Sequence, residues 1–217
     1  MYIPQQFEET RIEVLHHLMK SHPLAALVTL ADTGLVVNHV PFQIDGADGQ
    51  FGTLRAHLPR ANPVWRQLSS TVEAVAIFQG PESYVSPSWY PSKQVNGKVV
   101  PTWNYAVVHA HGHPRLIDDA DWLLNHLEAL TDEHEASQAR PWKVADAPKD
   151  FTDRLLAALV GIEIPISRME GKWKVSQNRL PADRLGVIAG LESRDDDRSR
   201  AMAELVRQHA GHSTFAD

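Results

Sequence analysis

The sequence predicts a mainly β protein with flanking helices (α+β), built on an antiparallel sheet or barrel. The first observation is the order of its elements: one helical segment precedes a run of four or five strands, and further helices precede one late strand. A parallel α/β sheet would need strands and helices to alternate, and they do not alternate here. The second observation is that 217 residues, of which 43% are hydrophobic, are enough to bury a core around such a sheet.

Hydrophobic periodicity and turn residues define the elements of the N-terminal part. Apolar residues recur at helical spacing up to Met19, and Pro23 ends that helix. Apolar segments separated by Asp- and Gly-rich turns then predict strands. The predicted elements are, in order, a helix over residues 7–20, two strands within 23–44 around a turn at 32–34, a turn at 45–49, a strand over 50–58, a short helix over 62–68 and a strand over Val72–Phe78.

Residues 79–105 form an unusual segment with four prolines, two tryptophans and three tyrosines. The prolines interrupt any regular element, while so many aromatic side chains are atypical of a disordered linker. Long ordered loops of this kind are usually functional. We therefore expect a loop here that covers a binding site.

The remaining chain predicts a second set of strands and helices. These are a strand over 106–117, helices over 119–136 and 148–160, a strand over 161–175 and a polar amphipathic helix over Arg198–Gln208. We expect one domain with peripheral helices over residues 1–192, followed by a C-terminal helical tail over 193–217.

Composition narrows the class of protein. The chain has no cysteine, which excludes disulfides and thiolate metal sites. The N-terminal residues lack a basic segment leading into an apolar run, and no apolar run approaches the ~20 residues of a membrane helix. We therefore expect a cytoplasmic protein that makes no membrane contact. A net charge of −6 also argues against tight binding to DNA.

Three alternating histidines, His109, His111 and His113, would point to one face of an extended strand. Neutral imidazoles can bind a zinc-like ion, but alternate side chains on a strand lie about 6–7 Å apart, which is wide for one ion. A half-exposed strand face is the alternative, and we expect no metal site. The sequence also lacks a nucleophile elbow, a P-loop and a dinucleotide-binding glycine motif, so no catalytic residue is assigned.

Polar and aromatic residues concentrate in three clusters. The clusters are His57, Arg60 and Asn62 with Trp65; Thr102, Trp103, Asn104 and Tyr105; and Lys172, Trp173, Lys174, Ser176, Gln177, Asn178 and Arg179. Together they offer cations for a phosphate, amides for the edge of a heterocycle and aromatic faces for a ring. A flavin mononucleotide (FMN) presents all three features. The alternative is that the aromatic residues close the ends of a barrel while the cations are solvated.

Longer motifs in the same regions resemble the PaiB family of FMN-binding negative transcriptional regulators. The motifs are HVPFQI, HLPRANPVW, FQGPESYVSPSWYPSK, VVPTWNYAVVHAHG and EGKWKVSQNR. The resemblance runs from residue 1 to about residue 191. It implies a split β-barrel of the type shared with pyridoxamine-phosphate oxidases, which forms homodimers that bind FMN at the subunit interface.

The resemblance also implies roles for residues of the three clusters. It places the phosphate near His57, Arg60 and Asn62, with Thr102 lining the site. The predicted phosphate partners are Lys172, Arg179 and Arg60, the predicted shields of the isoalloxazine are Trp103 and Trp173, and the predicted partners of its polar edge are Asn104, Ser176 and Gln177. If the protein is an enzyme, we expect the loop from Tyr84 to Lys93 to act as a lid, with Tyr90 or Lys93 in contact with the substrate.

Three functions remain open at this point. The first is an FMN-binding regulator, for which the family label implies DNA as a partner although the net charge does not support it. The second is an FMN-dependent reductase or oxidase of a small molecule, in which the flavin carries the redox chemistry. The third is a haem-binding or haem-degrading split barrel, since the chain has 12 histidines.

Overall fold

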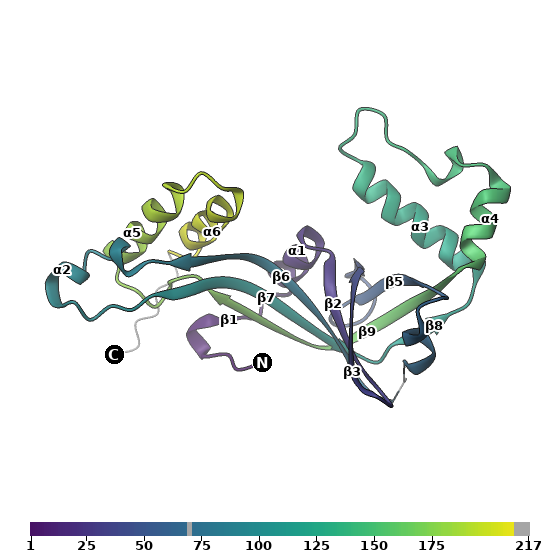
Figure 1. The fold of residues 1–217 in the computed structure, drawn as a ribbon, viewed down its shortest axis with the longest axis horizontal. Helices are drawn as coiled ribbons and strands as arrows, with labels where there is room; N and C mark the ends of the chain where they lie inside the picture. The colour runs from purple at the N-terminus through teal and green to yellow at the C-terminus, as the bar shows by residue number, and fades with distance from the viewer. Residues whose placement is uncertain (69–70, 211–217) are drawn as a thin grey trace. The chain divides into compact units, whose positions relative to one another are not determined.

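The computed structural model describes residues 1–68 and 71–210, which form an antiparallel sheet with helices against it (Figure 1). The hydrogen-bonded order of the strands is β3-β2-β6-β7-β9-β5-β4, and β1 and β8 pair with β9. This confirms the predicted α+β class. None of the helices in the described residues is both long and apolar enough to cross a membrane.

The elements follow one another in an order close to the predicted one. The strands are β1 (Glu8–Glu9), β2 (Leu24–Ala31), β3 (Gly34–Pro41), β4 (Gln43–Asp45), β5 (Thr53–Pro59), β6 (Ala74–Val85), β7 (Thr102–Gly112), β8 (Arg115–Ile117) and β9 (Leu159–Lys174). The α-helices are α1 (Ile12–Ser21), α2 (Lys93–Asn96), α3 (Ala120–Glu135), α4 (Lys149–Ala157), α5 (Pro181–Glu192) and α6 (Asp197–Gln208). Short 3-10 helices cover Gln5–Phe7, Pro63–Gln67, Pro87–Trp89 and Val144–Asp146.

The chain divides into two compact units. The first unit comprises Met1–Leu18, Gln79–Val108 and the described residues from Glu170 onward; the second comprises Met19–Phe78 and His109–Met169. The strands β6, β7 and β9 contribute residues to both units. The last residues of the predicted tail, 211–217, lie outside the described residues.

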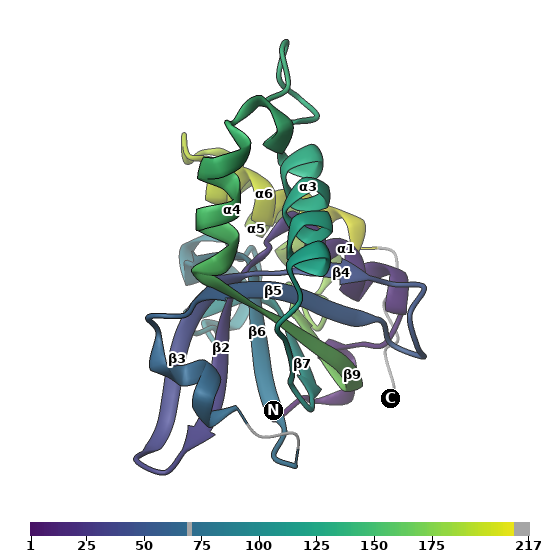
Figure 2. The same cartoon turned by 90° about the vertical axis from the view of Figure 1, so that its right-hand side faces the viewer.

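In the second unit, β2 and β3 form a hairpin in full register from Leu24–Pro41 to Ala31–Gly34, as predicted. Gly34 has a φ of +111°, a left-handed value that glycine adopts without strain and that this tight turn requires. The helices α3 and α4 lie side by side (Figure 2). Asp119 caps α3 because its carboxylate accepts a hydrogen bond from the backbone N–H of Trp122 at 2.8 Å.

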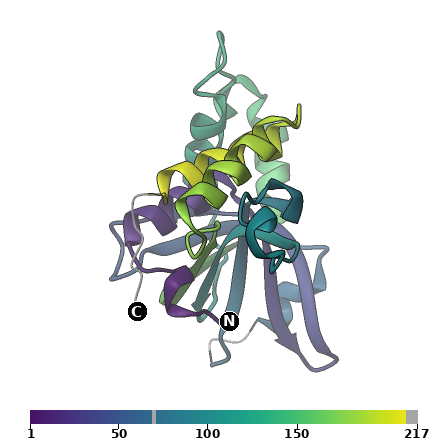
Figure 3. The same cartoon turned by 90° about the vertical axis from the view of Figure 1, so that its left-hand side faces the viewer.

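In the first unit, α5 and α6 pack against each other (Figure 3). Helix α6 matches the predicted helix, and Asp196 caps it by accepting from the backbone N–H of Ser199. Helix α5 was not predicted. Its apolar residues are spread over several faces and interrupted by two glycines, so the helical period is weak. Both glycines face the Trp89 segment, where a larger side chain would collide.

Two predicted boundaries are wrong. The helix predicted to begin at residue 7 begins at Ile12, because Glu8 and Glu9 pair with Lys172 and Gly171 of β9. The loop predicted over 79–105 is an irregular segment only between β6 and β7, because β6 continues to Val85 and β7 begins at Thr102. In both cases long-range strand pairing overrides local sequence signals.

Candidate functional site

The first unit exposes a sheet face that carries aromatic rings and lysines. It consists of Tyr84 on β6, Trp103 and Tyr105 on β7, and Lys172 and Lys174 on β9, and we call it the aromatic–lysine face. Alternate residues of a strand share a face, which brings both lysines to the same side. Trp103 is 51% exposed, and its ring meets that of Tyr84 edge-on with centroids 6.2 Å apart.

The two lysines lie over backbone oxygens and rings. Lys174 Nζ donates to the carbonyl of Trp103 at 2.6 Å and to the hydroxyl of Thr102. Lys172 Nζ donates to the carbonyl of Tyr2 at 3.0 Å and lies 5.4 Å from the centroid of the Tyr105 ring. Burial lowers the pKa of Lys174, and the nearby charges of Lys172 and Arg179 lower it further. These three cations therefore crowd together, and a nearby anion would relieve their repulsion.

Arg179 also lies against the segment between β6 and β7. Its guanidinium is 4.8 Å from the centroid of the Tyr90 ring. Tyr90 is 2% exposed, and no described residue accepts the proton of its hydroxyl. Burial raises the pKa of Tyr90, and the charge of Arg179 together with a hydrogen bond from its side chain only partly offsets this. Lys93, the other predicted lid residue, is exposed at the start of α2.

Asn104 and Ser176 lie in the interior and bond to each other. Asn104 Nδ2 donates to Ser176 Oγ at 2.9 Å, and Ser176 Oγ lies 3.3 Å from Asn104 Oδ1. Ser176 has a φ of +65°, which turns the chain sharply after β9. Gln177 closes this turn, because its amide accepts from the backbone N–H of Val175 at 2.8 Å and donates to the carbonyl of Trp173. These amides are therefore already partnered within the chain.

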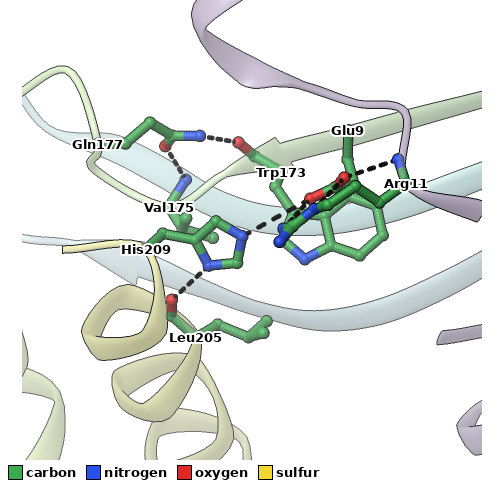
Figure 4. Close-up of polar contacts among 7 residues, drawn as sticks. All are labelled: Glu9, Arg11, Trp173, Val175, Gln177, Leu205 and His209. Atoms are coloured by element: carbon green, nitrogen blue, oxygen red, sulfur yellow. Dashed lines mark hydrogen bonds and ion pairs between the residues drawn. The ribbon is translucent and has the colours of Figure 1, made fainter. Parts of the chain in front are cut away.

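Trp173 points away from the aromatic–lysine face. It is 3% exposed and alternates with Lys172 and Lys174 along β9. Figure 4 shows its indole beside the Glu9–Arg11 pair and the imidazole of His209. Burial opposes ionisation of Glu9, but hydrogen bonds and the charge of Arg11 hold its pKa below the usual value. In this structure Trp173 is a core residue.

The first predicted cluster lies in the second unit, where its groups already have partners. His57 Nδ1 is 3.2 Å from His126 Nε2, and the rings meet edge-on. Trp122 stacks on His126 with centroids 5.2 Å apart. Burial lowers the pKa of His57, while burial and the charges of His57 and Arg55 lower the pKa of His126 to about 4. Both rings are therefore neutral at pH 7.

Arg60 and Asn62 are likewise engaged in the second unit. Arg60 forms an ion pair with Asp118, and its Nε donates to the carbonyl of Ala157 at 3.1 Å. Asn62 Nδ2 donates to Asn38 Oδ1 at 2.9 Å, while its Oδ1 accepts from the backbone N–H of Val64 and caps the following 3-10 helix. A phosphate at Arg60 would have to share this guanidinium with Asp118.

The three histidines do not form one continuous strand face. His109 and His111 lie on β7 with ring centroids 6.5 Å apart, whereas His113 is exposed beyond the end of that strand. Pro114 separates β7 from β8, so the strand predicted over 106–117 is two strands. The sequence had indicated this break by placing Gly112 and Pro114 there.

The structure therefore brings together the second and third predicted clusters and adds residues that were not assigned. Thr102 and Asn104 both contact the strand or turn that carries the third cluster. Tyr84 lies outside the predicted clusters, and Lys174 and Tyr105 lie within them but were given no role. The alternation of lysines along 172–174 was the available signal for Lys174, because it places both lysines on one side of a strand.

Comparison with known proteins identifies a family and several relatives of this chain. A family model described as "Putative FMN-binding domain" matches residues 1–168. An uncharacterized protein of Emericella nidulans is 33% identical over 96% of this chain and 97% of its own. The Protease synthase and sporulation protein PAI 2 of Bacillus subtilis is 28% identical over 95% of this chain and 96% of its own.

Among solved structures, the FAD and heme binding protein from Mycobacterium smegmatis aligns with a TM-score of 0.53 and 19% identity. The alignment covers 77% of this chain and 73% of that chain. At this identity the likeness shows the fold alone, a split barrel.

The residues of the first unit fit an FMN cofactor. Trp103 offers an exposed ring for stacking, and the crowded cations Lys172, Lys174 and Arg179 offer charge for a phosphate. The family match covers most of the chain, including β7 and most of β9. The chain therefore belongs to the FMN-binding family that includes PaiB-type proteins, and FMN is its cofactor.

Proposed function

We propose that the protein acts as an FMN-binding homodimer in which the flavin lies against the aromatic–lysine face. The observation that carries this proposal is Trp103: a large apolar ring, half exposed, beside lysines that have no carboxylate partner among the described residues. An exposed indole costs free energy in water, and stacking on a flat ring removes that cost. When bound, FMN supplies electron and hydride transfer chemistry.

Each group on this face has a definite role in the proposal. Trp103, with Tyr84 against its edge, stacks on the isoalloxazine. Lys172, Lys174 and Arg179 attract the phosphate, and charge-assisted bonds of this kind are the strong ones. Lys174 is already fixed by Thr102 and the Trp103 carbonyl, so little side-chain entropy is lost on binding. Asn104, Ser176 and Gln177 shape the turn that holds Arg179 in place.

Titration with FMN, followed by flavin absorbance and fluorescence, tests the position of the ring. Trp103→Ala is expected to weaken FMN binding about tenfold, since loss of an aromatic pair costs ~1–1.5 kcal/mol. Trp142→Ala is the matched control, because Trp142 is an exposed indole in the second unit and its loss is expected to leave affinity unchanged. Equal affinities for wild type and Trp103→Ala would reject this placement.

The second unit offers a surface for the homodimer. The outer face of the β2–β3 hairpin carries Leu24, Leu30, Leu35 and Val37, all exposed, and Leu35 is 75% exposed. Leu30 pairs with Leu35, and Val28 pairs with Val37, so these apolar side chains form a continuous surface. Contiguous exposed apolar surface of this kind marks an interaction site. A second copy of the chain is the partner that the proposal assigns to it.

The regulatory role implied by the resemblance finds little support in the helices. Each arginine of α6 is already paired: Arg198 with Glu82, Arg200 with Asp195 and Asp197, and Arg207 with Glu192 and Glu204. A helix that reads DNA would present such cations to phosphates. We therefore propose that any effect on transcription is an indirect consequence of flavin binding and does not require this protein to bind DNA. Salt-sensitive binding to promoter DNA in a gel shift would contradict this.

A flavin-dependent reductase or oxidase of a small molecule is the second candidate. The segment between β6 and β7 favours it, because it joins two residues of the aromatic–lysine face, Tyr84 and Trp103, and carries the exposed side chains of Lys93, Val95 and Val100. Such a segment is suited to covering a substrate at the ring. Bleaching of the bound flavin by NADH or NADPH would favour this candidate over a regulator.

A further inference from the structure

Arg184 stands out among the described residues of the first unit as a buried cation that forms no ion pair. It lies in the first turn of α5 and is 5% exposed. Two of its nitrogens, Nε and Nη1, are buried and have no hydrogen-bond acceptor among the described residues. A guanidinium stays protonated in proteins, so it cannot avoid the cost of burial by losing its charge. An uncompensated buried charge costs several kcal/mol, which indicates that an acceptor is missing.

A second buried group, whose proton has no acceptor, lies on the segment that packs against α5. The hydroxyl of Tyr90 is buried with Arg179 beside it as a donor, and no described residue accepts the hydroxyl proton. Gly186 of α5 lies against Trp89 and Pro91, on either side of Tyr90. The start of α5 is also tied to this segment, because the carboxylate of Asp183 accepts from the backbone N–H of Ser92 at 3.0 Å and from its hydroxyl at 2.8 Å. The two groups thus belong to two segments in direct contact.

The surrounding charges favour an anion over a neutral ligand. Arg179 precedes α5 and stacks on the Tyr90 ring, so two guanidinium groups flank this helix turn. The carboxylate of Asp183 is close enough for its charge to act on Tyr90, but it accepts two hydrogen bonds from Ser92 and is outnumbered by the two guanidinium groups. No side chain caps the N-terminus of α5, a helix of twelve residues whose first N–H groups add positive potential. A tyrosine hydroxyl that donates and an arginine that donates are complementary to an oxyanion.

We propose that Arg184 and Tyr90, with Arg179 beside them, form an enclosed anion site at the start of α5 that takes the phosphate or carboxylate group of a small acidic ligand. The phosphate of the flavin and the acid group of a separate substrate or effector share this chemistry. The proposal does not require FMN to bind, because these groups belong to the chain itself.

Thermal unfolding of the full-length protein without flavin, titrated with inorganic phosphate at constant ionic strength, tests the site. Phosphate is expected to raise the midpoint of wild type, and Arg184→Met is expected to weaken this response about tenfold or more. Without phosphate, Arg184→Met is expected to be as stable as wild type or more stable, because it removes an uncompensated buried charge. Tyr90→Phe is expected to weaken the response by a smaller factor.

Arg198→Met is the matched control. Arg198 also lies in the first turn of a helix of the first unit, but it is 83% exposed. This variant is expected to keep the phosphate response of wild type. The proposal is overturned if phosphate does not stabilise wild type, or if the phosphate response of Arg184→Met equals that of wild type. If Arg184→Met does not fold, the phosphate titrations of Tyr90→Phe and of wild type still test the proposal.

Repeating the titration with FMN-saturated protein distinguishes the two sources of the anion. An unchanged phosphate response means that the site takes a separate ligand. The site takes the flavin phosphate if the phosphate response is lost in FMN-saturated protein and if Arg184→Met loses more affinity for FMN than for riboflavin. Failure of FMN to bind while phosphate still stabilises the protein would reject the proposed function and leave this site intact.

Discussion

At the scale of single residues, the three cations near the aromatic–lysine face differ from several arginines elsewhere among the described residues. Arg55, Arg60 and Arg207 each pair with carboxylates, whereas Lys172, Lys174 and Arg179 contact carbonyls, a hydroxyl and rings. A cation without a carboxylate partner keeps its charge available to an anion. This difference, more than the number of cations, supports the proposal that the face is a ligand site.

The His57–His126 pair makes stability depend on pH. The folded-state pKa of both rings is lowered, that of His126 to about 4, whereas unfolded histidine titrates near pH ~6.5. Between these values the unfolded chain binds protons that the folded chain does not, so stability falls as pH falls from about 6.5 towards 4. Urea unfolding at a series of pH values measures this.

Variants of α3 assign that pH dependence to the pair. His126→Phe keeps a ring against Trp122 and is expected to flatten the dependence between about pH 6.5 and 4. His134→Phe is the control, because His134 is exposed on the same helix and its loss is expected to leave the slope unchanged. A slope that is the same in wild type and His126→Phe would contradict the assignment.

At the scale of elements, the docking of α5 depends on glycines that face a tryptophan. A methyl group at Gly190 would collide with the Trp89 ring, over which Arg194 also stacks at 4.8 Å. Helix propensity alone predicts that Gly190→Ala stabilises the protein by ~1 kcal/mol. Overpacking predicts instead a loss of ~1–3 kcal/mol.

Chemical unfolding of Gly190→Ala measures whether the substitution raises or lowers the free energy of unfolding. We expect destabilisation, and we expect Trp89→Leu to relieve it by removing the ring that the new methyl group meets. A Gly190→Ala variant that is more stable than wild type in the original background would show that α5 does not pack on Trp89 as described.

The elements also show what the sequence could and could not predict. The β2–β3 hairpin, α3 and α6 were predictable because alternation, caps and amphipathic spacing are local signals. The pairing of Glu8 and Glu9 with β9 was not, because it joins residues far apart in sequence. Helix α5 was missed because its two glycines, which weaken the helical signal, are required by its contact with the Trp89 segment.

The candidate site was predictable to a similar degree. The polar and aromatic clusters can be recognised from the local composition of the sequence. In the structure, a ligand can contact Trp103, Lys172 and Arg179 directly or interact with the charge of the two cations. The inward direction of Trp173 follows from strand alternation, but the sequence does not reveal which side of β9 is covered. The carboxylate partner of Arg60, Asp118, is distant in sequence and could not be foreseen.

At the scale of the whole molecule, the β2–β3 surface predicts assembly. Leu35→Asp with Val37→Asp would place two charges on the apolar face, and we expect this double variant to be monomeric where wild type is a dimer. Light scattering after size-exclusion chromatography measures the mass. Glu128→Asp with Glu133→Asp on α3 is a charge-conserving control. A dimer of unchanged mass in the double variant would place the interface elsewhere.

A crystal structure of the protein with bound FMN would show whether the flavin ring rests on the aromatic–lysine face. We expect the isoalloxazine in van der Waals contact with Trp103, and the phosphate within hydrogen-bond distance of at least one of Lys172, Lys174 and Arg179. An isoalloxazine bound elsewhere, with Trp103 still open to solvent, would contradict this expectation.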